Sequence, residues 1–237
     1  MVHSGKHPDA PWRNFHGRVK GKTLKPAQLR DLDDLLPRVR VPGVDWSENP
    51  DRTALDMAMF GDRPLWLEVG FGGGEHIAAQ AAANPDVAFI GCEPFINGVG
   101  MLLGKIRRAG LTNIWIHPGD ARDLFDVLPD GSVSKAFLLY PDPWPKARHH
   151  RRRFVTPDHL GPLHRCLADG AEFRVATDIG DYVRQTLEEV PKAGFHWHAG
   201  EAAHWRDPWS DWHRTRYEAK AIRENRVPHY LTFSRVP

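Results

Sequence analysis

The sequence predicts an α/β protein built on a mostly parallel sheet. Short apolar runs typical of buried strands recur along the chain and alternate with segments of helical pattern. The first of these strands leads into a glycine turn and an alanine-rich helix, as in nucleotide-binding βαβ units. Acidic residues follow several strands directly, at the sheet edge where such folds bind their ligands.

Residues 65–93 are the segment around which the rest of the chain is organised. An apolar strand at 65–67 is closed by Glu68, and after a glycine turn a helix is expected over 77–83. A second strand at 87–92 ends at Glu93. Glycine lets the chain turn sharply and lets a ligand approach where a Cβ would collide. The glycines of the turn are Gly70, Gly72 and Gly74.

The spacing of these glycines favours one cofactor over another. Dinucleotide sites usually have the pattern G-x-G-x-x-G, in which a helix N-terminus meets a pyrophosphate. Here the pattern is G-x-G-x-G, and Glu68 lies two positions before the first glycine. A carboxylate there disfavours pyrophosphate but suits the cationic amino-acid part of S-adenosylmethionine, while Glu93 is placed to accept the ribose hydroxyls. S-adenosylmethionine is therefore favoured over NAD, and a glycine turn without any ligand is the third alternative.

Composition sets broad limits. The chain has 237 residues, enough for one sizeable domain, with 41% hydrophobic and 26% charged residues. The sequence contains no run of about eighteen apolar residues, so it predicts no membrane span. The first residues lack the apolar core of a signal peptide. Cys92 and Cys166 are the only cysteines, which favours neither a disulfide scaffold nor a thiolate metal site. A cytoplasmic protein is expected.

The N-terminal part is predicted to differ from the rest. Residues 1–25 carry six Lys and Arg against the single acid Asp9, with Trp12 and Phe15 interleaved. Such a segment is either a solubilising tail or an arm that follows phosphates and stacks on bases. A short helix over 26–36 and an irregular connection follow. The expected division is therefore an arm and connecting segment over 1–63 and a catalytic domain over 64–237.

Further along the chain, a helix is expected over 96–109, capped by Gly110, and a strand over 114–117. Asp120 follows this strand. Its carboxylate could recognise the adenine amino group of a cofactor or simply cap the next helix, and the two alternatives are equal for this residue taken alone. Its place at a strand end favours the ligand site.

A strand over 135–140 leads into a stiff loop, Pro141-Asp142-Pro143-Trp144-Pro145-Lys146. This loop is a suitable place to present a carboxylate and a flat ring to a substrate. A run without acids follows immediately and predicts phosphate binding. Metal binding is rejected, because adjacent histidines do not share a helix face and no acidic or thiol partner lies at ligand spacing. The run contains Arg148, His149, His150, Arg151, Arg152 and Arg153.

The last third of the chain is expected to complete the sheet. The pattern predicts a helix over 156–167, a strand over 171–176 that is followed by Thr177 and Asp178, and a helix over 179–190. It also predicts strands over 195–198 and 230–233. No role is assigned to Trp205, Trp209 and Trp212. Thr215 and Glu218 match a capping box, and the helix N-terminus there could also hold the methionine carboxylate or a target base.

Taken together, these segments resemble the tRNA (guanine-N7)-methyltransferase family from about Phe15 to Phe233. The resemblance rests on LEVGFGGG, IGCEPFINGVG, HPGDA, LLYPDPWPKARHHRRRFV, RVATD and TRYEAKA. It implies a Rossmann-like class I methyltransferase fold, a three-layer sandwich whose seven-stranded sheet has an antiparallel last strand. Pro145 and the segment 223–230 depart from the family pattern.

The resemblance also implies roles for individual residues. S-adenosylmethionine would contact the glycine turn, Glu68, Glu93, Asp120 and the active-site residue Asp142. The acceptor would be a guanine in the variable loop of tRNA (tRNA position 46), with the arginine run on the RNA. Other substrate contacts implied are Lys146, Asp178, Thr215, Arg216, Tyr217 and Glu218.

Guanine N7 is already a nucleophile, so the mechanism expected is mainly positioning, with Asp142 or Asp178 stabilising the cationic product and Trp144 stacking on the base. Two other functions remain open: an RNA-binding module with an inactive methyltransferase fold, and an NAD-dependent enzyme. The expected protein contains no metal and is a monomer or a homodimer.

Overall fold

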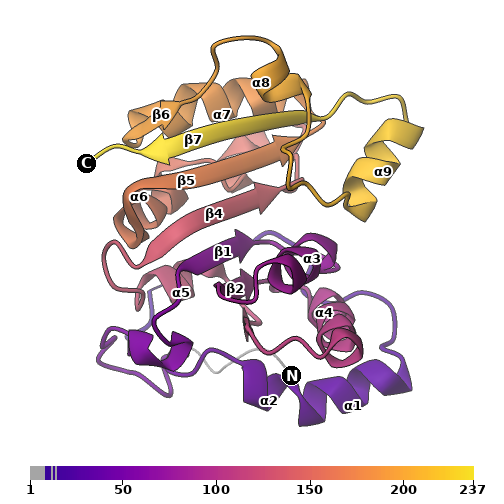
Figure 1. Cartoon of the computed structure of the whole chain (residues 1–237), viewed down its shortest axis with the longest axis vertical. Coiled ribbons are helices and arrows are strands. Elements are labelled where there is room, and N and C mark those ends of the chain that lie inside the picture. Colours follow the sequence, from indigo (N-terminus) through magenta and orange to yellow (C-terminus); the bar gives the residue numbers. More distant parts are fainter. Residues whose placement is uncertain (1–8, 12, 14) are drawn as a thin grey trace.

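Seven strands form one sheet in the computed structural model, which describes residues 9–11, 13 and 15–237 (Figure 1). Their order is β3-β2-β1-β4-β5-β7-β6, and β7 runs antiparallel to both of its neighbours while the other pairs are parallel. The predicted seven-stranded sheet with an antiparallel last strand is therefore confirmed. The strands are β1 Leu65–Val69, β2 Ala88–Cys92, β3 Ile114–His117, β4 Val133–Leu139, β5 Leu167–Thr177, β6 Phe195–Trp197 and β7 His229–Arg235.

Helices cover both faces of the sheet. On one face α3 and α4 pack on β2 and β3, and α1 packs outside them on α4; on the other face lie α5, α6 and α7. Side chains of β2 alternate between the two cores, because successive residues of a strand point to opposite faces. The helices are α1 Pro26–Asp34, α2 Leu36–Val39, α3 Glu75–Ala83, α4 Ile96–Ala109, α5 Ala121–Phe125, α6 Pro157–Cys166, α7 Gly180–Lys192, α8 Ala203–Arg206 and α9 Arg216–Arg223, with 3-10 helices η1 Met57–Phe60 and η2 Ala147–Arg152.

Several element boundaries differ from those predicted. The first strand continues to Val69, so Glu68 lies inside β1 and does not close it. The helix predicted over 26–36 divides at Leu35, and Pro37 lies in the first turn of α2, where its missing N–H costs nothing. The fifth strand starts at Leu167, earlier than expected.

The segment before β1 is part of the same body. Val41 donates its amide to Ile116 of β3 at 3.0 Å, and Val41, Val44 and Phe60 are buried in the core. The prolines and glycines of this segment predict an irregular connection, but its apolar residues are anchored on the sheet.

The tryptophan-rich loop covers the sheet where no crossover helix lies. Trp209 and Trp212 pack on Phe137 and Tyr230 of the central strands. Trp205 stacks on His229 with ring centroids 5.6 Å apart. Trp209 and Trp212 therefore cover the apolar face of β4, β5 and β7, whereas Trp205 packs against the core on the other face.

Candidate active site

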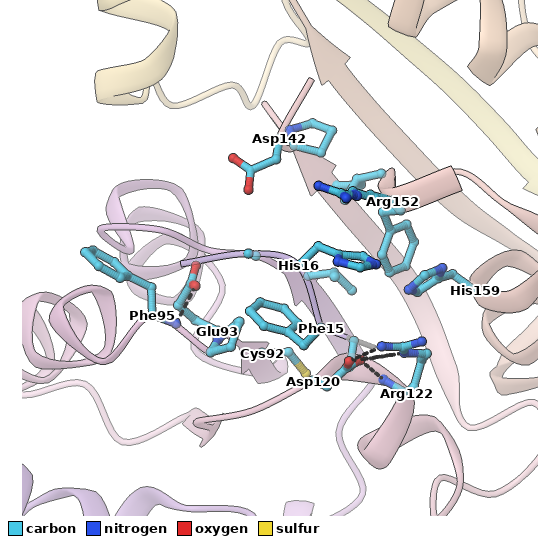
Figure 2. A pocket seen from close by; sticks show the side chains of 18 of the residues that line it. Phe15, His16, Cys92, Glu93, Phe95, Asp120, Arg122, Asp142, Arg152 and His159 are labelled. Atoms are coloured by element: carbon cyan, nitrogen blue, oxygen red, sulfur yellow. Dashed lines mark hydrogen bonds and ion pairs between the residues drawn. The ribbon is translucent and has the colours of Figure 1, made fainter. Parts of the chain in front are cut away.

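A cavity of about 1090 Å³ opens at the carboxyl ends of β1, β2, β3 and β4. Figure 2 shows side chains from the tips of these strands lying around it, among them Glu93, Asp120 and Asp142. Of the predicted site residues, it is lined by Gly70, Gly72, Glu93, Asp120, Asp142, Arg151, Arg152 and Tyr217.

Glu93 is held rigidly at the end of β2. Its two carboxylate oxygens accept from the backbone amides of Gly72 at 2.7 Å and Phe95 at 2.9 Å. Burial raises the pKa of Glu93, although both amide hydrogen bonds oppose that effect. The side chain is only 8% exposed, yet it lines the cavity, so its remaining lone pairs can accept hydroxyl groups there.

The glycine turn has two distinct parts. Gly70 and Gly72 line the cavity with φ of 71° and 55°, and a Cβ built on Gly70 would meet nothing within 4 Å. Gly74 caps α3 with φ 69° and faces the side chain of Leu102, away from the cavity lining. Gly70 therefore leaves room for a ligand, Gly72 lets the Tyr217 ring approach the turn, and Gly74 serves the packing of α3.

Glu68 does not line the cavity. Its side chain is 4% exposed, and Oε2 lies 2.7 Å from Nδ1 of His76, whose ring packs against Phe137 and Trp212. The carboxylate is thus engaged inside the domain, behind the glycine turn. The contact with the cofactor predicted for Glu68 has no support in this geometry.

Asp120 both faces the cavity and caps the following helix, the two alternatives considered for it. It lines the cavity, and its Oδ1 accepts from the amide of Arg122 at 2.9 Å as the cap of α5. Its Oδ2 also lies 2.5 Å from a guanidinium nitrogen of Arg122. Burial alone would raise the pKa of Asp120, but the hydrogen bonds from Arg122 outweigh it and the pKa is lowered.

Asp142 is exposed and lines the cavity, and no hydrogen bond or ion pair joins it to the part of the chain that the structure describes. The backbone around it is unusual, because Tyr140 and Trp144 have φ of 51° and 40°. Arg153 donates from Nε to the carbonyl of Pro143 at 2.7 Å. The loop is therefore fixed from behind while its carboxylate faces the cavity.

The arginine run divides between the cavity and the interior. Arg151 and Arg152 line the cavity, and Arg152 lies over the Trp144 ring at 5.0 Å. Arg148 is exposed, His149 contacts the edge of Trp144, and His150 lies 3.2 Å from Asp181.

Arg153 corrects the prediction that the whole run binds RNA. It is 1% exposed and donates to Gln185 at 2.8 Å and Asp181 at 2.7 Å, in addition to the Pro143 carbonyl. Its guanidinium also lies over the Tyr182 ring at 5.2 Å. A side chain so enclosed by α7 cannot reach a phosphate.

The predicted substrate residues around α9 have different environments. Tyr217 lines the cavity and lies against Gly72, where a Cβ would come within 2.8 Å of its ring. Arg216 donates to Glu75 of α3 at 2.9 Å. Thr215 accepts from the amide of Glu218 at 3.2 Å as the cap of α9.

Glu218 completes only half of the predicted capping box. Its carboxylate is 2% exposed and accepts from Trp212 Nε1 at 2.9 Å and from the Tyr230 hydroxyl, so it stabilises the base of α9 from inside. Two other predicted substrate residues also lie outside the cavity lining: Asp178 pairs with Arg226, and Lys146 is exposed at the start of η2.

The N-terminal arm contributes to the cavity in a way that the sequence did not indicate. Arg13 donates to Asp123 of α5 and to Asp126, which directly follows that helix, each at 2.8 Å. Farther along, Val19 accepts from the amide of Ile96 at 3.0 Å. Between these anchors, Phe15 and His16 lie among the labelled cavity residues (Figure 2). Trp12, also considered for base stacking, lies outside the described residues.

The start of α6 was missed as well. Phe154, Asp158 and His159 line the cavity beside Arg122. Burial lowers the pKa of His159 to about 4, with a further contribution from Arg122, so its ring is neutral at physiological pH. The only sequence signal was their position directly after the arginine run.

Two further findings concern the residues 9–11, 13 and 15–237. No three of their His, Cys, Asp and Glu side chains are grouped so as to hold a metal ion. None of their helices combines the length and the apolar character needed to span a membrane.

Comparisons with known proteins agree with the fold. Two solved structures share it at 17% identity each: the 16S rRNA methyltransferase KamB, with a TM-score of 0.56 over 84% of this chain and 99% of its own, and a 16S rRNA (adenine-N1)-methyltransferase from Catenulisporales acidiphilia, solved with its cosubstrate SAM, with a TM-score of 0.54 over 78% and 93%.

Sequence comparison identifies the family. Residues 62–231 match the model of a family described as putative methyltransferase. The chain is 68% identical over 230 residues to the tRNA (guanine-N(7)-)-methyltransferase of Jannaschia sp. (strain CCS1), covering 97% of both chains. With nearly full-length identity of this degree and the methyltransferase sheet, the chain belongs to the tRNA (guanine-N7-)-methyltransferase family.

Proposed function

We propose that the protein transfers the methyl group of S-adenosylmethionine to N7 of a guanine in the variable loop of tRNA, in the cytoplasm. The observation that carries this proposal is the cavity itself, in which Glu93, the glycine turn and Asp142 lie at adjacent strand ends. Family membership, and the cosubstrate SAM in a structural neighbour, support the cofactor.

The residues present fit the proposed cofactor. Gly70 faces open space, and Glu93 offers a rigid carboxylate to the ribose hydroxyls. Asp120 and Arg122 form a polar wall at the end of β3, where we place the adenine. S-adenosylmethionine, when bound, supplies an electrophilic methyl group on its sulfonium. Because Glu68 is engaged by His76, we assign it to the support of the glycine turn.

The chain's own part in the reaction is to position the base and stabilise charge. Guanine N7 attacks with its lone pair, so no base has to remove a proton from it. Asp142 can accept from guanine N1–H and N2–H and stabilise the positive charge that develops on the ring. Trp144, kept in place by Arg152, can stack on the base, which contributes about 1–3 kcal/mol per base.

Replacing Glu93 by alanine is expected to weaken S-adenosylmethionine binding by about 10- to 100-fold, because hydrogen bonds to a charged group contribute roughly 1.5–3 kcal/mol. Titration calorimetry measures this, with the melting temperature recorded for the same preparation. The affinity of Glu93→Gln, which retains one oxygen acceptor, should lie between those of the wild type and the alanine variant. Equal affinities for all three proteins would remove Glu93 from the site.

Replacing Arg151 and Arg152 by alanine is expected to weaken tRNA binding and to reduce the slope of log Kobs against log salt concentration by about 2, since each arginine is expected to neutralise one phosphate. A salt series of binding titrations measures the slope. The control is Arg108→Ala, an exposed arginine in the last turn of α4. If the slope stays at the wild-type value, both arginines face solvent in the complex.

The decisive experiment is incubation with labelled S-adenosylmethionine and unmodified tRNA, followed by nucleoside analysis. Label in 7-methylguanosine is the expected result. Binding of tRNA without transfer would indicate an inactive RNA-binding module. Binding of NAD and not of S-adenosylmethionine, in equilibrium dialysis with both, would indicate a dehydrogenase.

A further inference from the structure

We propose that the outward face of α9 is a second surface for tRNA phosphates, on the side of the cavity opposite the arginine run. This inference rests on the proposed tRNA substrate. It concerns Lys220 and Arg223, with Arg214 in the loop before the helix, and the sequence analysis assigns a role to none of them. Figure 1 shows α9 beyond the arrowheads of β4 and β5, at the edge of the sheet that carries the cavity.

The rotation of α9 is fixed by its inner face. Glu218 and Ala221 are its buried residues, and Glu218 is anchored by Trp212 and the Tyr230 hydroxyl. Residues spaced by three and four positions share a helix face, and in α9 the set opposite the buried pair is Arg216, Lys220 and Arg223. The helix therefore presents cations along one line, and successive cations are separated by about one helical turn, roughly 5.4 Å along the helix axis.

These cations are accessible and only partly neutralised, since Nε of Arg214 lies 3.7 Å from the Glu218 carboxylate and Lys220 lies near Glu224. The side chains of Arg214 and Lys220 are 69% and 56% exposed, and Arg223 is exposed. Lys220 lies 4.0 Å from Glu224, whose carboxylate also pairs with Arg226. Between residues 15 and 237, Arg223 makes no ion pair.

The line of cations starts at the cavity. Tyr217, in the first turn of α9, lines the cavity, and Arg216 ties that turn to Glu75 at the start of α3. Arg151 and Arg152 line the same cavity from η2. An RNA loop that inserts one base between Asp142 and Tyr217 must lay its backbone toward cationic side chains on both sides.

The positive charge of this surface indicates that its ligand is a polyanion. The whole chain has a formal charge of only +2, so a cationic helix face contiguous with the cavity is a local feature. Phosphates attract Lys and Arg through the release of counterions, whatever the base sequence. The flexible ends of Lys220 and Arg223 suit that form of contact better than base recognition.

The test compares two double variants. Lys220→Ala with Arg223→Ala removes the proposed contacts. Arg108→Ala with Lys192→Ala is the matched control, because these exposed residues end α4 and α7, which lead into strands at the sheet edge opposite the cavity. Both proteins and the wild type are titrated with unmodified tRNA over a salt series, and their sedimentation is measured.

The α9 variant is expected to bind tRNA less tightly, with a salt slope lower by about 2, while S-adenosylmethionine affinity and the control variant match the wild type. Lys220→Arg with Arg223→Lys should restore the wild-type slope. An unchanged slope in the alanine variant overturns the proposal. So does a change from dimer to monomer with unchanged tRNA affinity per subunit, which would assign the face to a second copy. Failure of the wild type to bind tRNA would instead overturn the proposed function.

Discussion

Alanine at position 142 is expected to lower kcat for guanine methylation by about 100- to 1,000-fold, with little change in S-adenosylmethionine affinity. The carboxylate of Asp142 lines the cavity without a partner among the described residues, so its interactions are available to the substrate. Loss of one preorganised electrostatic group typically has an effect of this size. Single-turnover methylation at saturating tRNA measures it, and calorimetry measures the cofactor affinity.

Asp142→Asn separates two roles of this residue. Asparagine retains the shape and one acceptor oxygen but has no negative charge, and its amide NH2, which replaces the second oxygen, accepts from neither guanine donor. If charge stabilisation dominates, the asparagine variant should be almost as slow as the alanine variant. Turnover close to the wild-type value in both would show that the carboxylate takes no part in the transfer.

Replacement of Arg153 by alanine is expected to destabilise the protein by roughly 2–4 kcal/mol, through the cavity it leaves and the unpaired groups around it. The carbonyl of Pro143, Gln185 and Asp181 would each lose a donor. Hydrogen bonds from Arg153, and then from Arg184, hold the pKa of Asp181 at about 2. The melting temperature should fall by roughly 4–16 °C for a chain of this size.

Arg151→Ala is the matched control, since it removes the same side chain two positions earlier in the same run. It should leave the melting temperature unchanged and weaken tRNA binding, because Arg151 is exposed at the cavity. Equal melting temperatures for the Arg153 variant and the wild type would contradict the structural role described above.

The contrast between these two arginines illustrates what the sequence could not predict. A run of like charges has no internal pattern that separates a buried member from exposed ones. Which arginine is buried depends on Asp181 and Gln185, about thirty positions away on α7. Glu68 raises the same difficulty, because the acid and glycine pattern gave no sign that His76 would engage it.

Features set by local chemistry were predicted well. The helix over 96–109 has the expected bounds, because its apolar residues repeat with the helical period and Gly110 ends it with φ 64°. The strand over 114–117 is also as predicted. The arm was predicted as a basic segment, but its place over the cavity depends on Asp123 and Asp126, far along the chain.

The antiparallel direction of β7 has a practical consequence for handling the enzyme. Because β7 runs opposite to β5, its last residues lie at the sheet edge remote from the cavity, whereas Phe15 and His16 of the N-terminal arm line the cavity. Affinity tags, fluorophores or attachment to a sensor chip therefore belong after Pro237. A bulky group fused in front of Met1 would be attached to the arm whose Phe15 and His16 line the cavity.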